Sequence, residues 1–451
     1  MESNIKQVVA IIGGGVAGSE VAAQLAERGI CCLLFEQNAL PYGKIEEGLP
    51  KWHVKLRDQE EQKIDHKIDQ PDVHYIPKTR LGENVNLKKL QEWGVSAIVL
   101  AFGAWRDRRL PIEDIDDYVG KGLYYQNHLV SWFNHKHESH SHVSPCEIQD
   151  GAIVIGGGLA SLDVVKIVMF EIVLEALRKK GIKSDLFSLE KEGISAVLKQ
   201  HGLTVKKLEI KGCTLFYRRK IEDMPLTPLP ISIDRTKKEK IFELRRRILA
   251  NFQHKYCFKV MECYSPVDKV IEYDRLTGIV FQKGEIVPRK PAALPAELKT
   301  VYAPLLISSI GSVPEKFAEI PQQNDLIMLE KPQLGKVKGY DNIFAVGNAV
   351  TGRGNIRESL IHSREISQIL MRDFLEWQAD NFEELVRLQE LNSAQMVKEL
   401  DQHLRTRAAL SGQNISDILS RVGQLQKRVG YQGNYQEWIR QNMPLRLENM
   451  D

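Results

Sequence analysis

Closely spaced glycines are the residues of this sequence best placed to hold a ligand for chemistry. The first group, Gly13-x-Gly15-x-x-Gly18, follows an apolar run and opens a segment with helical periodicity. The first glycine permits a tight turn, the second lets a pyrophosphate approach the backbone, and the third lets helix and strand pack closely. The free N–H groups at the start of the helix favour the negative charge of a phosphate. The spacing therefore predicts a dinucleotide site.

An acidic residue, Glu36, ends the next apolar run, residues 31–35. A carboxylate in this place accepts hydrogen bonds from a ribose diol, and its charge repels a 2′-phosphate. Val16 and Ala17 follow the glycine turn and would offer their backbone N–H groups to the phosphates. The alternative is a glycine-rich turn without a ligand, but the strand, the helix and the acid all stand in the expected register.

A second glycine group, Gly156-x-Gly158-x-x-Ser161, repeats this spacing with a small residue in the third place. The strand that follows it ends in Arg218 and Arg219 instead of an acid. Guanidinium groups match a phosphate by paired hydrogen bonds, which favours NADPH over NADH. A solvated basic turn is the alternative. The helical N–H groups that would face this nucleotide belong to Leu159 and Ala160.

A third glycine segment contains Gly347-Asn348 and, shortly after it, Gly354-Asn355-Ile356. The pattern indicates a strand, a glycine loop and the start of a new helix. A helix N-terminus directed at a flavin would stabilise the ring in its anionic reduced form. The alternative is an ordinary loop.

Parallel strands and helices are needed to position these groups, and the apolar pattern predicts both. Continuous apolar runs at residues 8–12, 31–35 and 97–101 are typical of strands buried on both faces of a parallel sheet. The same strand–turn–helix order starts again after residue 150. We therefore predict an α/β fold with two Rossmann-like three-layer domains. From about residue 375 the apolar spacing is helical, which predicts a helical C-terminal extension.

Several motifs follow one another along the chain: IIGGGVAG with FEQ, PYGKIEEGLP, LAFGAW, VIGGGLASLDVVKI, YRRKIEDMP, LISSIG and FAVGNAVTGRGNI. In this order they resemble the adrenodoxin reductase family of ferredoxin–NADP reductases. The chain is also similar to the NADPH- and FAD-binding small subunit of glutamate synthase. The resemblance covers roughly residues 5–372.

The resemblance implies an FAD-binding domain built from residues 1–120 and 320–374, with an NADP-binding domain, residues 121–319, inserted between them. Residues 375–451 form the extension. The resemblance also implies that hydride passes from NADPH to FAD and that electrons leave to a ferredoxin-like or other redox acceptor. Flavin contacts are implied for the first and third glycine groups and for Glu36, Gln37, Gly43, Lys44, Thr79, Phe102, Gly103 and Ala104.

Hydride transfer requires stacking of the nicotinamide on the flavin and no acid or base, so we expect positioning residues instead of a catalytic triad. His53, near the position of the family's histidine, is the one candidate for a catalytic side chain. Two alternatives stay open: an electron-input subunit of a larger redox complex, and a flavin-binding assembly protein without turnover. The C-terminal helices could mediate such a complex or a homo-oligomer.

Composition excludes some classes of function. The net charge of +3 over 451 residues gives no bulk argument for nucleic-acid binding, and no apolar run is long enough to span a bilayer. The six cysteines form no C-x-x-C pair, which suits a reducing compartment and predicts a cytoplasmic protein. Residues 134–142 contain four histidines, which we interpret as a solvated loop and not as a metal site.

Overall fold

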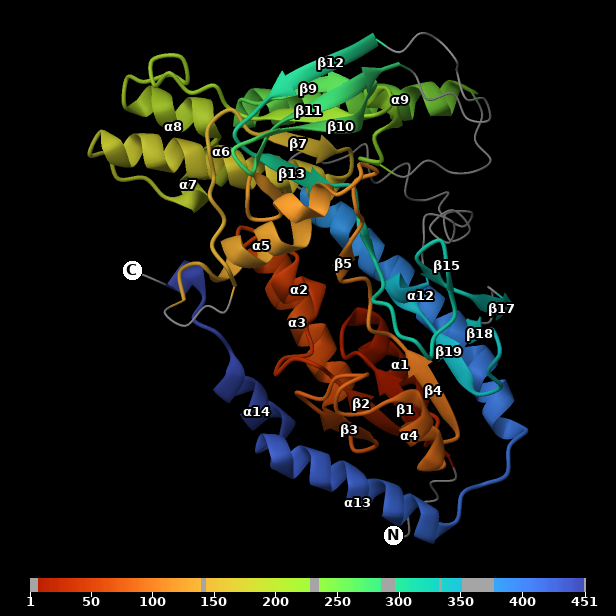
Figure 1. Cartoon of the computed structure of the whole chain (residues 1–451). Coiled ribbons are helices and arrows are strands. Elements are labelled where there is room, and N and C mark those ends of the chain that lie inside the picture. Colours follow the sequence, from red (N-terminus) through yellow and green to blue (C-terminus); the bar gives the residue numbers. More distant parts are fainter. Residues whose placement is uncertain are drawn as a thin grey trace. The chain divides into compact units, whose positions relative to one another are not determined.

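The computed structural model describes residues 7–138, 143–227, 235–284, 297–331, 335–350 and 377–449. The chain forms two compact units (Figure 1). The first unit consists of Met1–Leu49, His53–Arg106 and Val313–Asp451, and the second consists of Pro50–Trp52 and Asp107–Ser312. The second unit is thus inserted into the sequence of the first.

The first unit is built on a mixed sheet. Its strands are β1 (Val8–Ile12), β2 (Cys31–Phe35), β3 (Val73–Ile76), β4 (Ala97–Leu100), β17 (Leu329–Lys331), β18 (Lys336–Val337) and β19 (Ile343–Ala345). Their order is β17-β18-β19-β4-β1-β2-β3, and the strands from β19 to β3 are parallel. Every residue of β1 and β2 is buried, so these apolar runs are covered on both faces, as predicted.

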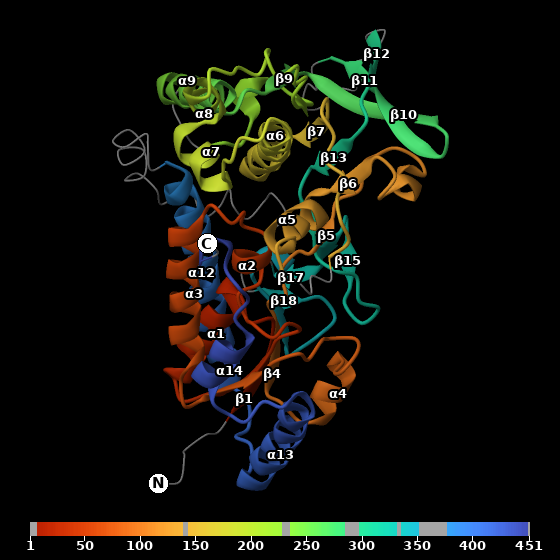
Figure 2. The ribbon, with the colours of Figure 1, turned by 90° about the vertical axis from the view of Figure 1, so that its left-hand side faces the viewer.

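Helices cover the two faces of this sheet. One face, with Val9 and Ile11 of β1, packs against α1 (Val16–Ala26), α3 (Val54–Ile68), α12 (Trp377–Arg405) and α14 (Tyr435–Asn442). Figure 2 shows α3, α1 and α12 side by side. The other face packs against α4 (Leu87–Glu92) and α13 (Gly412–Val429). The short elements of this unit are α2 (Lys44–Glu47), β15 (Gln322–Gln323), β16 (Leu326–Ile327), η4 (Gly347–Ala349) and η6 (Leu447–Asn449).

The C-terminal helices belong to the core of the first unit. Helix α13 buries Ile418, Val422 and Leu425, whose spacing places them on one face of the helix. Helix α14 buries Trp438 and Ile439 against the opposite face of the sheet. The predicted helical character is confirmed, but these helices pack on the sheet and do not project from it as an appendage.

The second unit has a parallel sheet of five strands. They are, in spatial order, β6 (Leu123–Tyr125), β13 (Leu306–Ser309), β7 (Ile153–Gly156), β8 (Thr214–Tyr217) and β9 (Lys259–Glu262). An antiparallel sheet of β10 (Tyr264–Glu272), β11 (Arg275–Lys283) and β12 (Glu297–Tyr302) shares an apolar core with it. Its helical elements are α5 (Gln126–His135), α6 (Leu159–Lys179), α7 (Leu186–Glu192), α8 (Ile194–Gln200), α9 (Arg235–Tyr256), η1 (Ile115–Tyr118) and η2 (Ile221–Asp223). The short strands β5 (Arg106–Asp107) and β14 (Ser312–Val313) lie where the chain passes between the units.

Each parallel sheet contains a point at which the strand order reverses. In the first unit β1 lies between β2 and β4, and in the second β7 lies between β8 and β13. In open α/β sheets, the crevice outside the carboxyl ends of the strands at such a point is the usual ligand site. The first and second of the three predicted glycine groups follow these central strands. Among the described residues, the helices are too short or too polar to cross a membrane.

Candidate functional site

The first glycine turn brings β1, β4 and α1 into very close contact. Gly13 has a φ of +105°, and a Cβ atom there would lie 2.6 Å from the carbonyl oxygen of Ala101. A Cβ atom on Gly18 would lie 1.8 Å from the carbonyl oxygen of Gly13. In contrast, the nearest atom to a Cβ on Gly15 would be the carbonyl oxygen of Pro41 at 3.9 Å. The turn is therefore closed toward the protein and leaves space at Gly15 for a close ligand.

The N-terminus of α1 is open toward the same space. Its N-cap is Gly15, and no side chain caps the helix. The N–H groups of Val16 and Ala17 lie in the first turn, where an α-helix offers no internal acceptor. Gly347, with a φ of +69°, packs on this turn, since a Cβ atom there would lie 2.7 Å from the Cβ of Ala17. The third glycine segment thus reaches the first turn through Gly347.

Of the other predicted residues in the third glycine segment, Asn348 lies within the described part of the chain. Asn348, which follows Gly347 in η4, is exposed. Gly354, Asn355 and Ile356 lie outside the described residues.

Glu36 is buried, with 5% of its surface exposed. Its carboxylate accepts hydrogen bonds from the backbone N–H groups of Gly14, at 2.8 Å, and Asn38, at 2.9 Å. Burial raises the pKa of this carboxyl to about 7, although the backbone donors oppose the rise. A carboxylate oxygen can accept more than one hydrogen bond, so capacity for a ribose hydroxyl remains. Glu36 therefore fixes the glycine turn as well as facing the site.

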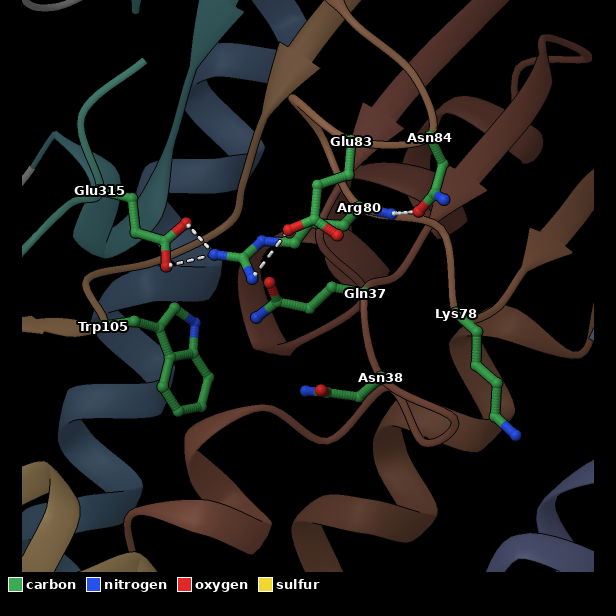
Figure 3. Close-up of a pocket in the computed structure, with 8 residues that line it drawn as sticks. All are labelled: Gln37, Asn38, Lys78, Arg80, Glu83, Asn84, Trp105 and Glu315. Atoms are coloured by element: carbon green, nitrogen blue, oxygen red, sulfur yellow. Dashed lines mark hydrogen bonds and ion pairs between the residues drawn. The ribbon is translucent and has the colours of Figure 1, made fainter. Parts of the chain in front are cut away.

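A cleft of about 520 Å³ lies beside the end of β2 in the first unit (Figure 3). Its walls are polar apart from one indole ring, and they consist of Gln37, Asn38, Lys78, Arg80, Glu83, Asn84, Trp105 and Glu315. Arg80 forms ion pairs with Glu315 at 3.0 Å and Glu83 at 3.3 Å. Of the lining residues only Gln37 was predicted. The motif LAFGAW contains Trp105, so this residue could have been found from the sequence.

Four other predicted residues lie near Trp105 or beside Glu36. A Cβ on Gly43, with φ +53°, would be 3.8 Å from the indole of Trp105 and 3.9 Å from Gly15. The ammonium group of Lys44 lies 5.6 Å from the indole centroid. A Cβ on Gly103, with φ +72°, would be 3.8 Å from the indole nitrogen of Trp105. Thr79 is buried and donates its backbone N–H to the carbonyl of Glu36 at 2.8 Å.

Three predicted residues of this unit remain: Phe102, Ala104 and His53. Phe102 makes a T-shaped contact with Phe317 at 5.3 Å between ring centroids, and Ala104 is buried. His53 is half-buried and precedes α3, where its carbonyl oxygen accepts the N–H of Arg57.

The second glycine turn is closed toward the protein by different atoms. A Cβ atom on Gly156 would lie 2.4 Å from the carbonyl oxygen of Ser309, and one on Gly157 would lie 2.2 Å from the ring of Tyr217. No atom lies within 4 Å of a Cβ placed on Gly158, and no side chain caps α6, which begins with Leu159 and Ala160. This turn also leaves space for a ligand at Gly158 and at the N-terminus of α6.

Ser161 lies beneath the second turn. It is 1% exposed, its hydroxyl donates to the carbonyl of Ser309 at 3.0 Å, and its backbone N–H donates to that of Gly158 at 3.0 Å. Both of its donor groups are therefore used within the protein. Ser161 thus joins α6 to β13 by the close packing expected of a small third residue, and its place among the NADP-binding residues stays a prediction.

Arg218 and Arg219 follow β8 directly, next to the turn that follows β7, because these two strands pair. Arg218 is exposed and Arg219 is half-buried. The preceding Tyr217 is fixed by donating its hydroxyl hydrogen to the carbonyl of Asp223 at 3.0 Å. By strand register Tyr217 holds the place that Glu36 occupies in the first unit, and Arg218 and Arg219 come one and two residues later.

The histidine-rich segment is described only in part. His135 forms a 2.7 Å contact with Glu138 through Nδ1, whereas His140 and His142 lie outside the described residues. Over the part of the chain that the structure describes, no three His, Cys, Asp or Glu side chains are grouped so that they could hold a metal ion.

The two glycine turns, each at a strand-order reversal, define a class of fold, a chain with two Rossmann-like units. Residues 7–182 match the pyridine nucleotide-disulphide oxidoreductase family. The chain is 28% identical over 166 residues to the probable mitochondrial NADPH:adrenodoxin oxidoreductase of Schizosaccharomyces pombe. This match covers 36% of this chain and 34% of that protein. Over 172 residues the chain is 26% identical to the NADPH glutamate synthase small chain of Mycobacterium tuberculosis, covering 35% and 32%. The chain thus spans about a third of the length of these two relatives.

A solved structure extends the likeness to nearly the whole fold. Mycobacterium tuberculosis FprA in complex with NADPH matches with a TM-score of 0.65 at 17% identity, over 94% of this chain and 91% of that one. The predicted α/β fold with two Rossmann-like domains is confirmed. The resemblance to adrenodoxin reductase-type ferredoxin–NADP reductases and to the glutamate synthase small subunit is confirmed as well.

Proposed function

We propose that the chain is an FAD-dependent oxidoreductase that takes hydride from NADPH and passes electrons to a ferredoxin-like acceptor. The observation that carries this proposal is the pair of glycine turns at the two strand-order reversals, each with an uncapped helix and an open side. One turn adjoins a buried acid and the other adjoins two arginines. The named relatives act with NADPH, which agrees with this assignment.

The residues present fit both cofactors. For FAD, the space at Gly15 and the N–H groups of Val16 and Ala17 suit a pyrophosphate, and Glu36 suits a ribose diol. For NADPH, Gly158 and the N-terminus of α6 suit the pyrophosphate. The flavin and nicotinamide rings supply the redox chemistry when bound.

In this mechanism the protein's own groups bind, orient and select. The glycine turns fix where each pyrophosphate lies, and the helix N-termini compensate its charge. Arg218 and Arg219 would hold a 2′-phosphate, so they determine the choice of donor. No side chain has to move a proton, which fits the absence of a required acid or base in hydride transfer.

The proposal also names an acceptor and a compartment. We propose a ferredoxin-like acceptor because it is the partner type implied by the resemblance, and the cytoplasm because all six cysteines are free thiols. The apolar faces of α13 and α14 are buried within this chain. A complex or oligomer through these helices would therefore use their exposed polar faces.

An anaerobic titration tests the proposal. The purified protein should be yellow, and NADPH should bleach its flavin at a much lower concentration than NADH. A screen of ferredoxins should then find one that reoxidises it. A flavin that neither nucleotide reduces would rule out the reductase and leave a flavin-binding assembly protein. Co-purification with a larger enzyme would indicate an electron-input subunit.

A further inference from the structure

The C-terminal residues contact a loop that forms one wall of the first glycine turn. Trp438 of α14 donates its indole N–H to the carbonyl oxygen of Ala39 at 2.7 Å. Tyr435, also of α14, donates to the carboxylate of Asp65 at 2.7 Å, and Tyr42 donates to the same carboxylate at 3.1 Å. The start and the middle of residues 39–47 are thus tied to α14.

The end of this loop is tied by an arginine. Arg446 is 7% exposed, and its guanidinium bonds to Glu46 of α2 and to both carboxylate oxygens of Glu61 of α3, the latter at 2.9 Å. Both carboxylates are buried as well. Burial raises the pKa of Glu61, Arg446 opposes the rise, and the neighbouring Glu46 adds to it. Removing Arg446 would take this cation from two buried acids, with Arg57 remaining 3.8 Å from Glu61.

The same loop touches the glycine turn on its other side. A Cβ on Gly14 would lie 2.8 Å from the Cβ of Pro41, and one on Gly43 would lie 3.9 Å from the Cα of Gly15. Regular structure in the loop is limited to the four residues of α2. A short segment of this kind depends on contacts with its neighbours for its position.

We propose that residues 431–449, here called the C-terminal strap, position the 39–47 loop against the FAD pyrophosphate, with Arg446 as the main positioning residue. The strap would then set FAD affinity without touching the cofactor. This inference rests on the proposed function, because it takes FAD as the ligand. It gives the C-terminal helices a role inside the flavin unit, where the resemblance offers no account of them.

The first test compares two arginines of the same C-terminal region in the full-length protein. Arg446→Met removes the buried bridge, whereas Arg440→Ala removes an exposed arginine of α14 that pairs with Glu437. We expect the Kd for FAD, measured by flavin fluorescence on reconstitution, to rise roughly ten- to hundredfold in Arg446→Met, the range seen when groups that orient metal ligands are lost. The visible circular dichroism of bound flavin should change too. Arg440→Ala should match the wild type.

A second set of variants separates positioning from stability. Arg446→Met with Glu46→Gln and Glu61→Gln removes the stranded charges, so it should unfold near the wild-type temperature and still bind FAD weakly. Trp438→Phe keeps an aromatic ring and removes the donor to Ala39, so it should weaken FAD binding by a smaller factor.

One result would overturn the strap, and a different one would overturn the proposed function. If the triple variant and Trp438→Phe bind FAD as tightly as the wild type with the same flavin spectrum, the strap only stabilises the fold and the inference is overturned. If the wild-type protein itself binds no FAD, the proposed function fails instead.

Discussion

The two glycine turns make the same contact at the first residue of the motif but differ at the third residue. In each unit, a Cβ on the first glycine would lie against the carbonyl oxygen at the end of the strand across the order reversal, that of Ala101 or Ser309. Gly13 adopts a positive φ and directs its carbonyl oxygen at Gly18, where no side chain fits. Gly156 has no positive φ, and Ser161 fits beneath it by hydrogen bonding to Ser309. The third position therefore depends on how the first glycine is turned.

The residues at the ends of β2 and β8, the strands that follow the two glycine turns, differ more. In the first unit the carboxylate of Glu36 accepts the N–H of Gly14, and in the second the ring of Tyr217 fills the space over Gly157. The buried acid of the first turn is thus replaced by an uncharged ring, and the charged residues move outward to Arg218 and Arg219. This exchange removes the group that would repel a 2′-phosphate and places cations at the rim.

The largest effect is expected from substitutions at the third position of each glycine motif, Gly18 and Ser161. Gly18→Ser places atoms where the carbonyl of Gly13 lies, and we expect it to cost about 3 kcal/mol or more and to abolish FAD binding. The matched change Ser161→Gly loses one hydrogen bond and adds backbone freedom, for about 1–2 kcal/mol. Urea denaturation and flavin content per chain measure both. A Gly18→Ser protein that purifies with a full complement of FAD would show that this close packing is not required.

The residues that follow β8 should determine the preference for NADPH over NADH. Replacing Arg218 and Arg219 together with alanine removes two charge-assisted hydrogen bonds, so kcat/KM for NADPH should fall roughly hundredfold, with little change for NADH. Arg178→Ala is the control, because this exposed arginine of the same unit pairs with Glu175 at the end of α6. Equal losses for NADPH and NADH would mean that the arginines shape the unit and do not read the 2′-phosphate.

The sequence predicted the turns and central strands because their signals are local. Five consecutive buried apolar residues followed by glycines identify β1 without any knowledge of its neighbours. Gly43 and Lys44 were found only through a family motif, because the fold brings them near the indole of Trp105. Local spacing alone could not have placed them there.

Other features depend on partners distant in the sequence. Arg80 and Glu315 face each other across the cleft from positions 235 residues apart. The spacing of Ile418 and Val422 showed that one face of α13 would be buried, but not that the sheet of the first unit would cover it. The hairpin of β10 and β11 turns at Tyr273 and Asp274, both with positive φ and without the glycine that usually marks such a turn.

The last prediction concerns the proton that Glu36 holds in the first turn. The pKa of Glu36 is raised from 4.5 to about 7 in the folded chain, so the folded state binds more protons than the unfolded state between these values. The stability of the FAD-free protein should therefore decrease as the pH rises through this window, by at most about 3 kcal/mol from this group. The second turn has an aromatic ring, that of Tyr217, in place of this carboxyl.

Glu36→Gln isolates this contribution, because other buried carboxyls such as Glu61 also titrate but do so in both proteins. We expect a constant loss of about 1–2 kcal/mol from the altered hydrogen bonds, together with a shallower pH dependence in urea denaturation than the wild type shows. Added FAD should flatten the wild-type profile, since ribose hydroxyls that donate to Glu36 favour its ionised form. Parallel profiles for the two FAD-free proteins would mean that Glu36 is already ionised throughout. In that case the N–H groups of Gly14 and Asn38 outweigh burial, and the first turn holds a negative charge beside its ligand at the place where the second turn has the ring of Tyr217.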